Sequence, residues 1–238
     1  MSKLTSCPLE IQGIGQVLVT RRKGSRRISM RIGNDGSIRV CHPWFVSKKE
    51  VERFIINNAE WIEIHKNKIS KQKKVFSLNQ EIKTFSHSIK ILPTEKGKIR
   101  AGIHNETVII AIPETEDVNS HEIQDYIKKI IINICRSEAK LYLPQRVKEL
   151  AGKHNFNFNQ VYIKYLKSKW GSCSSAGNIN LNLILMLQPS HLIDYIILHE
   201  LSHTMEPNHG KKFWDLLDKI TDGKAKELNK EMKICFFI

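Results

Sequence analysis

The chain contains 238 residues, of which 41% are hydrophobic and 8% aromatic. These values are ordinary for a folded protein and exclude a disordered or fibrous one. The 38 Lys and Arg exceed the 24 Asp and Glu by a formal charge of +14, so an anionic partner is favoured. The five cysteines lie at least 34 positions apart, which excludes a paired-cysteine zinc knuckle and argues against a disulfide framework. Without a recognisable signal peptide or membrane-spanning stretch, a cytoplasmic location is expected.

The first part of the chain is expected to combine paired strands with a helix. Apolar alternation and frequent glycines predict strands between residues 11 and 40. Asn34-Asp35-Gly36 has the composition of a hairpin turn, because these residues tolerate positive backbone dihedrals. Ser47 followed by Glu50 is a capping-box pattern, and apolar residues at helical spacing predict one amphipathic helix from there to a Lys-rich segment at 71–74.

The second part of the chain alternates strand and helix patterns. Residues 79–112 return to strand-like alternation and predict a second hairpin region. Ser120 is placed to cap a long helix that continues toward Leu150, with Pro144 as a potential kink. The later expected elements are strands near 160–187, a helix from about Ser190 to Met205 with Ser190 as its cap, and a final helix from about Lys211 to Lys233. No internal sequence repeat is visible.

Residues 199–203 read H-E-x-x-H, a pattern whose chemistry depends on its being helical. Residues four apart lie one turn above each other on the same face, so the imidazoles of His199 and His203 can converge on one metal ion. Glu200 lies about a quarter turn away, where its carboxylate can act on water without binding the metal. The pattern therefore predicts His199 and His203 as ligands and Glu200 as the general base.

A third ligand is expected, because a catalytic zinc takes three protein ligands and keeps one position open. His209 is the candidate, since a proline between it and His203 stops the helix and lets the chain turn back. Glu206 is an alternative third ligand with a suitable oxygen, and Glu227 and Glu231 are remoter ones. We therefore predict a Zn²⁺ site formed by His199, His203 and His209.

These residues give the chain a resemblance to the YgjP-like metallopeptidase family, which is related to the WLM and SprT-like zinc metalloproteases. The resemblance implies a zinc peptidase with His199, His203 and His209 as ligands and Glu200 as base. Some relatives in this wider group act on proteins attached to DNA. The matching stretches are Arg26 to Ser29 with Gly36 to Pro43, Phe54 to Trp61, Lys169 to Ser174, and His199 to Trp214.

The segment before the metal helix reads as strands, and the resemblance gives it a further meaning. In zincin-like proteases an edge strand above the metal helix pairs with an extended peptide, and the strand after the turn near residue 176, or its partner at 161–167, could do so. A purely structural hairpin is the alternative. Cys173 is expected to be a small turn residue and not a nucleophile, because no partner histidine can be identified for it.

Arg21, Arg22, Lys23, Arg26 and Arg27 form the densest cationic cluster. No aromatic residues are interleaved with them, so a solvated basic face is favoured over specific nucleic-acid recognition. Nucleic acid nevertheless stays a candidate partner through the basic surface, because the whole chain is strongly cationic.

Together these patterns predict an α+β protein. Residues 1–78 would form an N-terminal basic sheet-and-helix portion, and residues 79–238 a zincin-like portion in which the metal helix packs on a small sheet. The expected function is a zinc-dependent metallohydrolase, a peptidase that cleaves peptide or protein substrates by Glu-assisted attack of zinc-bound water. The alternatives are a metal-dependent nucleotide phosphoanhydride hydrolase and a nucleic-acid-binding module with structural zinc.

Overall fold

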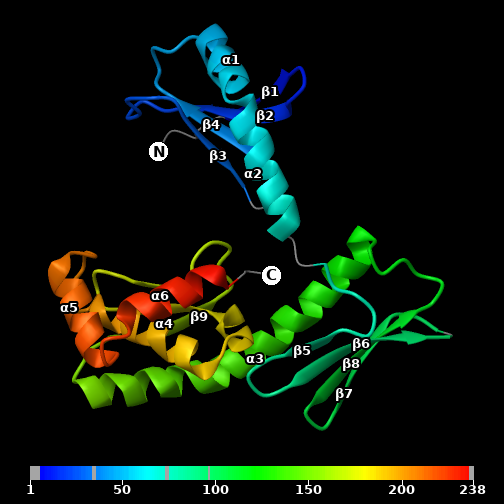
Figure 1. Cartoon of the computed structure of the whole chain (residues 1–238), viewed down its shortest axis with the longest axis vertical. Helices are drawn as coiled ribbons and strands as arrows, with labels where there is room; N and C mark the ends of the chain where they lie inside the picture. Colours follow the sequence, from blue (N-terminus) through cyan, green and yellow to red (C-terminus); the bar gives the residue numbers. More distant parts are fainter. Residues whose placement is uncertain (1–5, 34–35, 73–74, 96, 236–238) are drawn as a thin grey trace. The chain divides into compact units, whose positions relative to one another are not determined.

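The structure, a computed structural model, describes residues 6–33, 36–72, 75–95 and 97–235. The chain divides into two compact units, Met1–Lys74 (unit 1) and Val75–Ile238 (unit 2), and each is described by itself (Figure 1). Within the described ranges there are three small sheets and six α-helices, which confirms the α+β class. None of the described helices is both long enough and apolar enough to cross a membrane.

Unit 1 is a four-stranded sheet followed by two helices. Its sheet has the order β1-β2-β4-β3, in which the central strands β2 and β4 are parallel and the outer pairs antiparallel. Val51 and Ile55 lie one helical turn apart and bury one face of the first helix in the core. The elements are β1 Ser6–Ile11, β2 Gly15–Arg21, β3 Ser29–Ile32, β4 Ile38–His42, α1 Lys48–Asn57 and α2 Ala59–Gln72.

The helical part of unit 1 differs from the expected single helix. The capping box is confirmed, because the Ser47 side chain accepts from the backbone N–H of Glu50 and the Glu50 carboxylate accepts from that of Ser47. The helix then breaks at Asn58, whose backbone leaves the helical region at φ −110° and whose side chain donates to Phe54 O at 2.8 Å. Of the expected turn, residues 34 and 35 lie outside the described residues, while the flanking strands β3 and β4 do pair antiparallel.

Unit 2 begins with a sheet of the same design. Its order is β5-β6-β8-β7, again with a parallel central pair and antiparallel outer pairs. Although the sequence shows no repeat, the two units therefore share strand order and direction. The expected second hairpin region is thus a complete four-stranded sheet. Its strands are β5 Glu81–Lys83, β6 Ser88–Thr94, β7 Arg100–His104 and β8 Thr107–Pro113.

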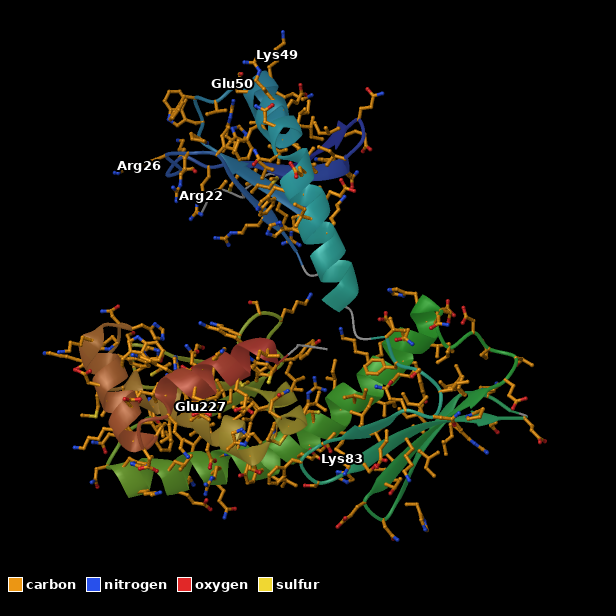
Figure 2. All side chains as sticks on the ribbon, in the orientation of Figure 1. Arg22, Arg26, Lys49, Glu50, Lys83 and Glu227 are labelled. Atoms are coloured by element: carbon orange, nitrogen blue, oxygen red, sulfur yellow. The ribbon has the colours of Figure 1, made fainter. Side chains whose placement is uncertain are left out.

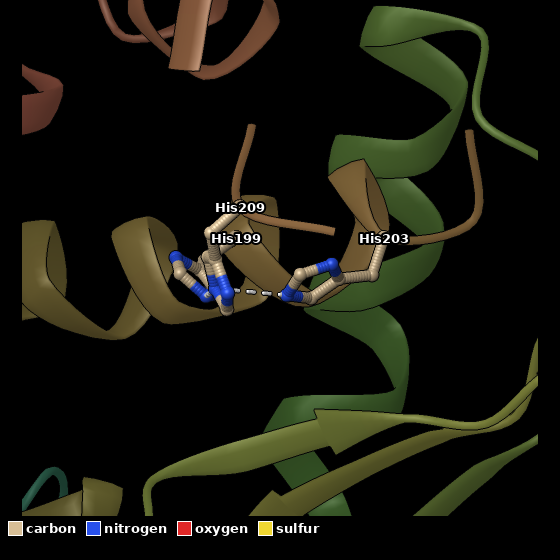
Figure 3. Close-up of side chains that lie close together, drawn as sticks. All are labelled: His199, His203 and His209. Atoms are coloured by element: carbon tan, nitrogen blue, oxygen red, sulfur yellow. Dashed lines mark hydrogen bonds between the residues drawn. The ribbon is translucent and has the colours of Figure 1, made fainter. Parts of the chain in front are cut away.

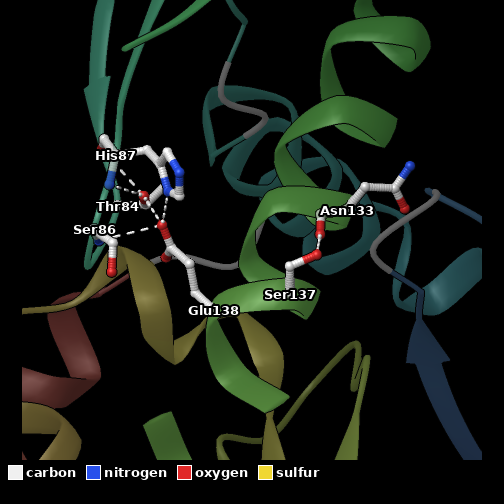
Figure 4. A network of polar contacts seen from close by, with 6 residues as sticks. All are labelled: Thr84, Ser86, His87, Asn133, Ser137 and Glu138. Atoms are coloured by element: carbon white, nitrogen blue, oxygen red, sulfur yellow. Dashed lines mark hydrogen bonds and ion pairs between the residues drawn. The ribbon is translucent and has the colours of Figure 1, made fainter. Parts of the chain in front are cut away.

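Helix α3 (His121–His154) connects this sheet to the rest of unit 2 (Figure 1). The predicted cap is confirmed, since the Ser120 side chain accepts from Ile123 N, and the helix continues through Pro144. The turn between β5 and β6 is tied to α3 through the buried Glu138 (Figure 4). Its Oε1 accepts from Thr84 Oγ1 at 2.6 Å and Ser86 N at 3.2 Å, and lies 2.6 Å from His87 Nδ1.

The last part of unit 2 contains three strands and three α-helices; its first strand and first α-helix pack against α3, and the two later helices pack against that first helix. The sheet has the order β10-β11-β9, so that β10 is an edge strand. Helix α4 is pinned to α3 by Arg146, whose Nε and Nη2 donate to the two carboxylate oxygens of Asp194 at 2.8 and 2.7 Å. The elements are β9 Val161–Lys164, β10 Gly171–Cys173, β11 Ile179–Asn182, a 3₁₀ helix η1 Leu183–Leu187, α4 Ser190–Ser202, α5 Lys211–Ile220 and α6 Ala225–Ile234.

Three expectations for this region were wrong. Residues 183–187 form a 3₁₀ helix and not strand, because the Asn182 side chain accepts from Ile184 N and starts a helical turn. Helix α4 is capped by Pro189 without a side-chain hydrogen bond, and it ends at Ser202 instead of Met205. The single final helix is two, because Asp222 and Gly223 adopt positive φ angles of 52° and 77° that no α-helix can accommodate.

Candidate metal centre

Three histidines converge at the end of α4 (Figure 3). His199 belongs to the last turn of the helix, His203 is its C-cap with φ −67° and ψ −15°, and His209 lies in the loop before α5. The Nε2 atom of His209 is 3.0 Å from that of His199 and 3.2 Å from that of His203. The structure thus brings together the three histidines that the sequence selects.

The spacing of these nitrogens fits a tetrahedral metal ion. Zinc binds imidazole nitrogen at 2.0–2.1 Å, which places neighbouring ligand nitrogens about 3.3 Å apart. Hydrogen bonding alone does not explain the arrangement, because the Nε2 atom of a neutral imidazole either donates one N–H or accepts with one lone pair, whereas His209 Nε2 is close to two nitrogens. A cation that accepts lone pairs from all three nitrogens satisfies the whole group.

The surroundings favour the neutral, metal-binding form of two of the imidazoles, those of His199 and His203. Burial, followed by the proximity of His203 and His209, lowers the pKa of His199 to about 3. Burial also lowers the pKa of His203. Its Nδ1 lies 3.1 Å from the backbone oxygen of Glu206, a contact that places the proton on Nδ1 and leaves Nε2 free to bind.

The ring of Phe213 packs against all three imidazole rings. Phe213 is fully buried, and its ring centroid lies 5.0, 4.5 and 4.7 Å from those of His199, His203 and His209. The ring stacks on His203 with an interplanar angle of 25°. Phe213 entered the sequence analysis only within a matching stretch, but its i, i+4 spacing to the buried Leu217 is the signal of an inward face of α5.

Glu200 lies in the same cleft as the histidines. The cleft has a volume of about 710 Å³ and includes residues from β10, α4, the following loop and α6. Burial raises the pKa of the Glu200 carboxyl to about 7, while the charge of Lys169 and a hydrogen bond from the Cys173 backbone oppose that rise. The result is a carboxylate that can accept a proton near neutral pH.

The carboxylates named as alternative ligands are not part of this group. Within the described part of the chain, the only group of three or more potential ligand atoms is that of the three histidines. Glu206 contacts His203 through its backbone oxygen. Glu231 Oε1 lies 2.9 Å from His191 Nε2, and Glu227 is not among the residues that line the cleft.

The position of Glu200 depends on a glycine that sequence reasoning missed. A Cβ added at Gly171 would lie 2.7 Å from both Cγ and Oε1 of Glu200 and 2.9 Å from its Cδ. Any side chain at residue 171 therefore displaces the carboxylate. From the sequence alone, Gly171 is recognisable only as part of a strand and of a stretch that matches the family, because a close approach between distant segments leaves no local pattern.

Substituting Gly171 with Ala is expected to reduce kcat/KM for peptide cleavage by about 100-fold, the usual cost of a misplaced catalytic group. Gly102→Ala is the matched control, because Gly102 also lies in a strand but a Cβ there meets nothing within 4 Å. Steady-state kinetics of both variants checks the prediction. Equal activity of the two would show that Glu200 tolerates the methyl group.

The loop that carries Lys169 and Trp170 is held by a second residue that the sequence analysis did not select. Asn182 is fully buried, and its Nδ2 donates to Leu166 O at 2.7 Å and Lys169 O at 2.9 Å. Its Oδ1 accepts from the backbone N–H of Leu166 and Ile184, each at 3.3 Å. One side chain thus orients the connection that leads into Gly171.

Asn182→Asp is expected to lower the free energy of unfolding by about 2 to 4 kcal/mol, because a buried carboxylate would face two carbonyl oxygens without a proton to donate. Asn133→Asp is the control: Asn133 is exposed on α3 and serves as an acceptor for Arg136, so a change below about 0.5 kcal/mol is expected. Urea denaturation of both variants measures the difference. Similar stabilities would contradict the role assigned to Asn182.

The site and the fold indicate a class of protein. Two histidines one helical turn apart, a third from the next loop and a buried glutamate in the same cleft are typical of metallopeptidases. The model of one family, described as YgjP-like, metallopeptidase domain, matches residues 26–234. The chain therefore belongs to the YgjP-like family.

Two of the solved structures that are similar to this chain are metallopeptidase zymogens. Abylysin of Pyrococcus abyssi is 23% identical, with 38% of this chain and 90% of that chain covered and a TM-score of 0.35. Jannalysin of Methanocaldococcus jannaschii is 29% identical, with 37% and 91% covered and a TM-score of 0.34. No curated protein gave a significant match.

Proposed function

We propose that the chain is a zinc-dependent peptidase with a zincin-like site. The observation that carries this proposal is the convergence of three imidazole nitrogens in one cleft with a buried carboxylate. Family membership supports peptidase activity, and the nitrogen-only ligand set suits zinc better than magnesium or calcium, which prefer oxygen. The cytoplasmic location expected from the sequence belongs to the same proposal.

In this proposal His199, His203 and His209 hold the ion, and Glu200 moves the proton. When bound, zinc supplies a Lewis acid that polarises the scissile carbonyl and acidifies water. Glu200 takes a proton from the attacking water and later delivers it to the leaving amine. A pKa near 7 suits both steps, because the group must be a base first and an acid afterwards.

The substrate would lie along β10. This strand is at the edge of its sheet, and its residues 171–173 line the cleft that contains Glu200 and the histidines. An extended peptide that follows this edge passes over the carboxylate and the three imidazoles. Main-chain hydrogen bonds to an edge strand bind peptides with little dependence on their side chains.

The proposal is tested by measuring metal content and hydrolysis on the same preparation. The purified chain is expected to contain about one zinc per molecule and to cleave casein or an unstructured peptide library, with cleavage lost on chelation and restored by zinc. Nucleoside triphosphates serve as the parallel substrate. Hydrolysis of these without peptide cleavage would favour a phosphoanhydride hydrolase, and zinc without any hydrolysis would favour a structural site.

A further inference from the structure

Two loops of unit 1 meet at one edge of its sheet, the edge formed by the C-terminal ends of the two central strands. The central strands β2 and β4 are parallel, so the loops that follow them leave from the same end. The backbone N–H of Arg22, directly after β2, donates to the oxygen of His42 at the end of β4 at 2.9 Å. The cationic segment 21–27 is therefore adjacent to the segment Pro43–Val46, which is distant in sequence.

This second segment presents two large aromatic rings to solvent. Trp44 is 62% exposed and Phe45 is 63% exposed, and their rings meet edge to face with centroids 5.9 Å apart. The turn that carries them is anchored, because Pro43 is buried and Val46 N donates to Pro43 O at 3.3 Å. Rings of this size are normally buried, so an exposed pair on an anchored turn indicates a binding surface.

The neighbouring loop supplies positive charge. Arg21, Arg22, Lys23, Arg26 and Arg27 are all exposed, and Figure 2 shows the Arg22 and Arg26 side chains extending from this end of the sheet. Among the residues that the structure describes, no carboxylate forms an ion pair with any of the five. Residues 1–74 hold 16 Lys and Arg against 6 Asp and Glu, so unit 1 accounts for +10 of the +14.

The matching sheet of unit 2 shows that the fold itself does not require these residues. There β8 ends at a buried proline, Pro113, much as β4 is followed by the buried Pro43, and a serine N-cap again precedes the next helix. The exposed residues that follow this proline, however, are Glu114, Thr115, Glu116 and Asp117. The loop that follows β8 is thus acidic and without aromatic rings, so this sheet topology does not itself require the exposed rings that follow β4 in unit 1.

We propose that this basic aromatic edge, formed by Arg21, Arg22, Lys23, Arg26, Arg27, Trp44 and Phe45, binds single-stranded nucleic acid. Guanidinium groups bind phosphate with paired hydrogen bonds, and exposed rings provide platforms on which unpaired bases stack. From the sequence alone a solvated basic face is favoured, because no aromatic residue lies between the cations. The rings come instead from the parallel neighbouring strand, a juxtaposition that only the topology reveals.

A binding assay on the full chain tests the proposal. Labelled single-stranded DNA and RNA of mixed sequence, about 20 nucleotides long, are titrated beside a duplex of equal length. Tighter binding of at least one single strand than of the duplex is expected. If all five cations contact phosphates, affinity should fall by about 100-fold between about 50 and 200 mM salt. The Glu200→Gln variant should bind equally well, which separates this property from peptide cleavage.

Variants locate the binding surface. Trp44→Ala/Phe45→Ala should weaken single-strand binding by about tenfold or more without changing the number of charges. Arg22→Gln/Arg26→Gln should weaken it and reduce its salt dependence, whereas Lys83→Gln/Lys90→Gln, which removes the same charge from exposed sites in unit 2, should change it by less than about threefold. Thermal unfolding of each variant verifies that it folds.

Two results would overturn the proposal. One is that single strands and the duplex bind with equal affinity and that the Trp44→Ala/Phe45→Ala variant binds as tightly as the unmodified chain. The edge would then be a nonspecific cationic surface. The other is binding to phosphatidylglycerol vesicles, weakened by the aromatic variant, without binding to either oligonucleotide. Exposed aromatic and basic residues also occur at membrane interfaces, and that result would assign the edge to a lipid surface.

Discussion

Glu200→Gln is expected to reduce kcat for peptide cleavage by about 1,000-fold or more while zinc stays bound. General base catalysis by a positioned side chain contributes about 100- to 10,000-fold, and glutamine preserves the shape of the side chain but cannot accept the proton. The ligands are untouched, because Glu200 is not one of the three residues whose nitrogens converge. Metal analysis and steady-state kinetics of the same preparation check both halves of the prediction.

Glu206→Gln is the matched control for that experiment. Glu206 lies six positions after Glu200, and its backbone oxygen, which lies 3.1 Å from His203 Nδ1, is retained by the substitution. The kcat of the Glu206→Gln variant should stay within about twofold of that of the unmodified enzyme, as for a surface substitution. Full activity of Glu200→Gln would contradict the assignment of the base, and loss of zinc in that variant would show that Glu200 belongs to the metal site instead.

The sequence predicted the α+β class and the presence of most elements, but not where several of them end. The periodicity of residues 211–233 is helical throughout, yet the chain turns at Asp222 and Gly223. The helix after Ser47 also breaks locally, at Asn58, where the backbone leaves the helical region with a φ of −110°. Helical periodicity records which face is buried, and it continues across such a break when both helices pack on the same core.

The candidate site was predictable where chemistry depends on local spacing. His199 and His203 follow from one helical turn, whereas Gly171 and Asn182 act on residues that lie far from them in the sequence. The proximity of Trp44 to the cationic segment 21–27 also depends on the parallel pairing of two strands. Such contacts have no sequence period, so a single sequence cannot reveal them.

His209→Ala is expected to weaken zinc binding by more than about 100-fold and to abolish measurable peptide cleavage. Loss of even an outer-shell partner weakens metal binding by about 10- to 100-fold, so loss of a direct ligand should have a larger effect. Because a ligand that binds only the folded state stabilises it, zinc should raise the Tm of the unmodified chain and raise that of the variant much less. This thermal shift gives a readout that is independent of catalysis.

His209 is the informative ligand because its position depends on a loop and not on the helix. His199 and His203 would converge in any regular helix, whereas His209 reaches them only if the chain turns back after Ser202, where α4 ends. His104→Ala, at an exposed histidine in β7, should leave the thermal shift unchanged. If Glu206→Ala lost zinc and His209→Ala kept it, Glu206 would be the third ligand and the turn after α4 would differ from the one described.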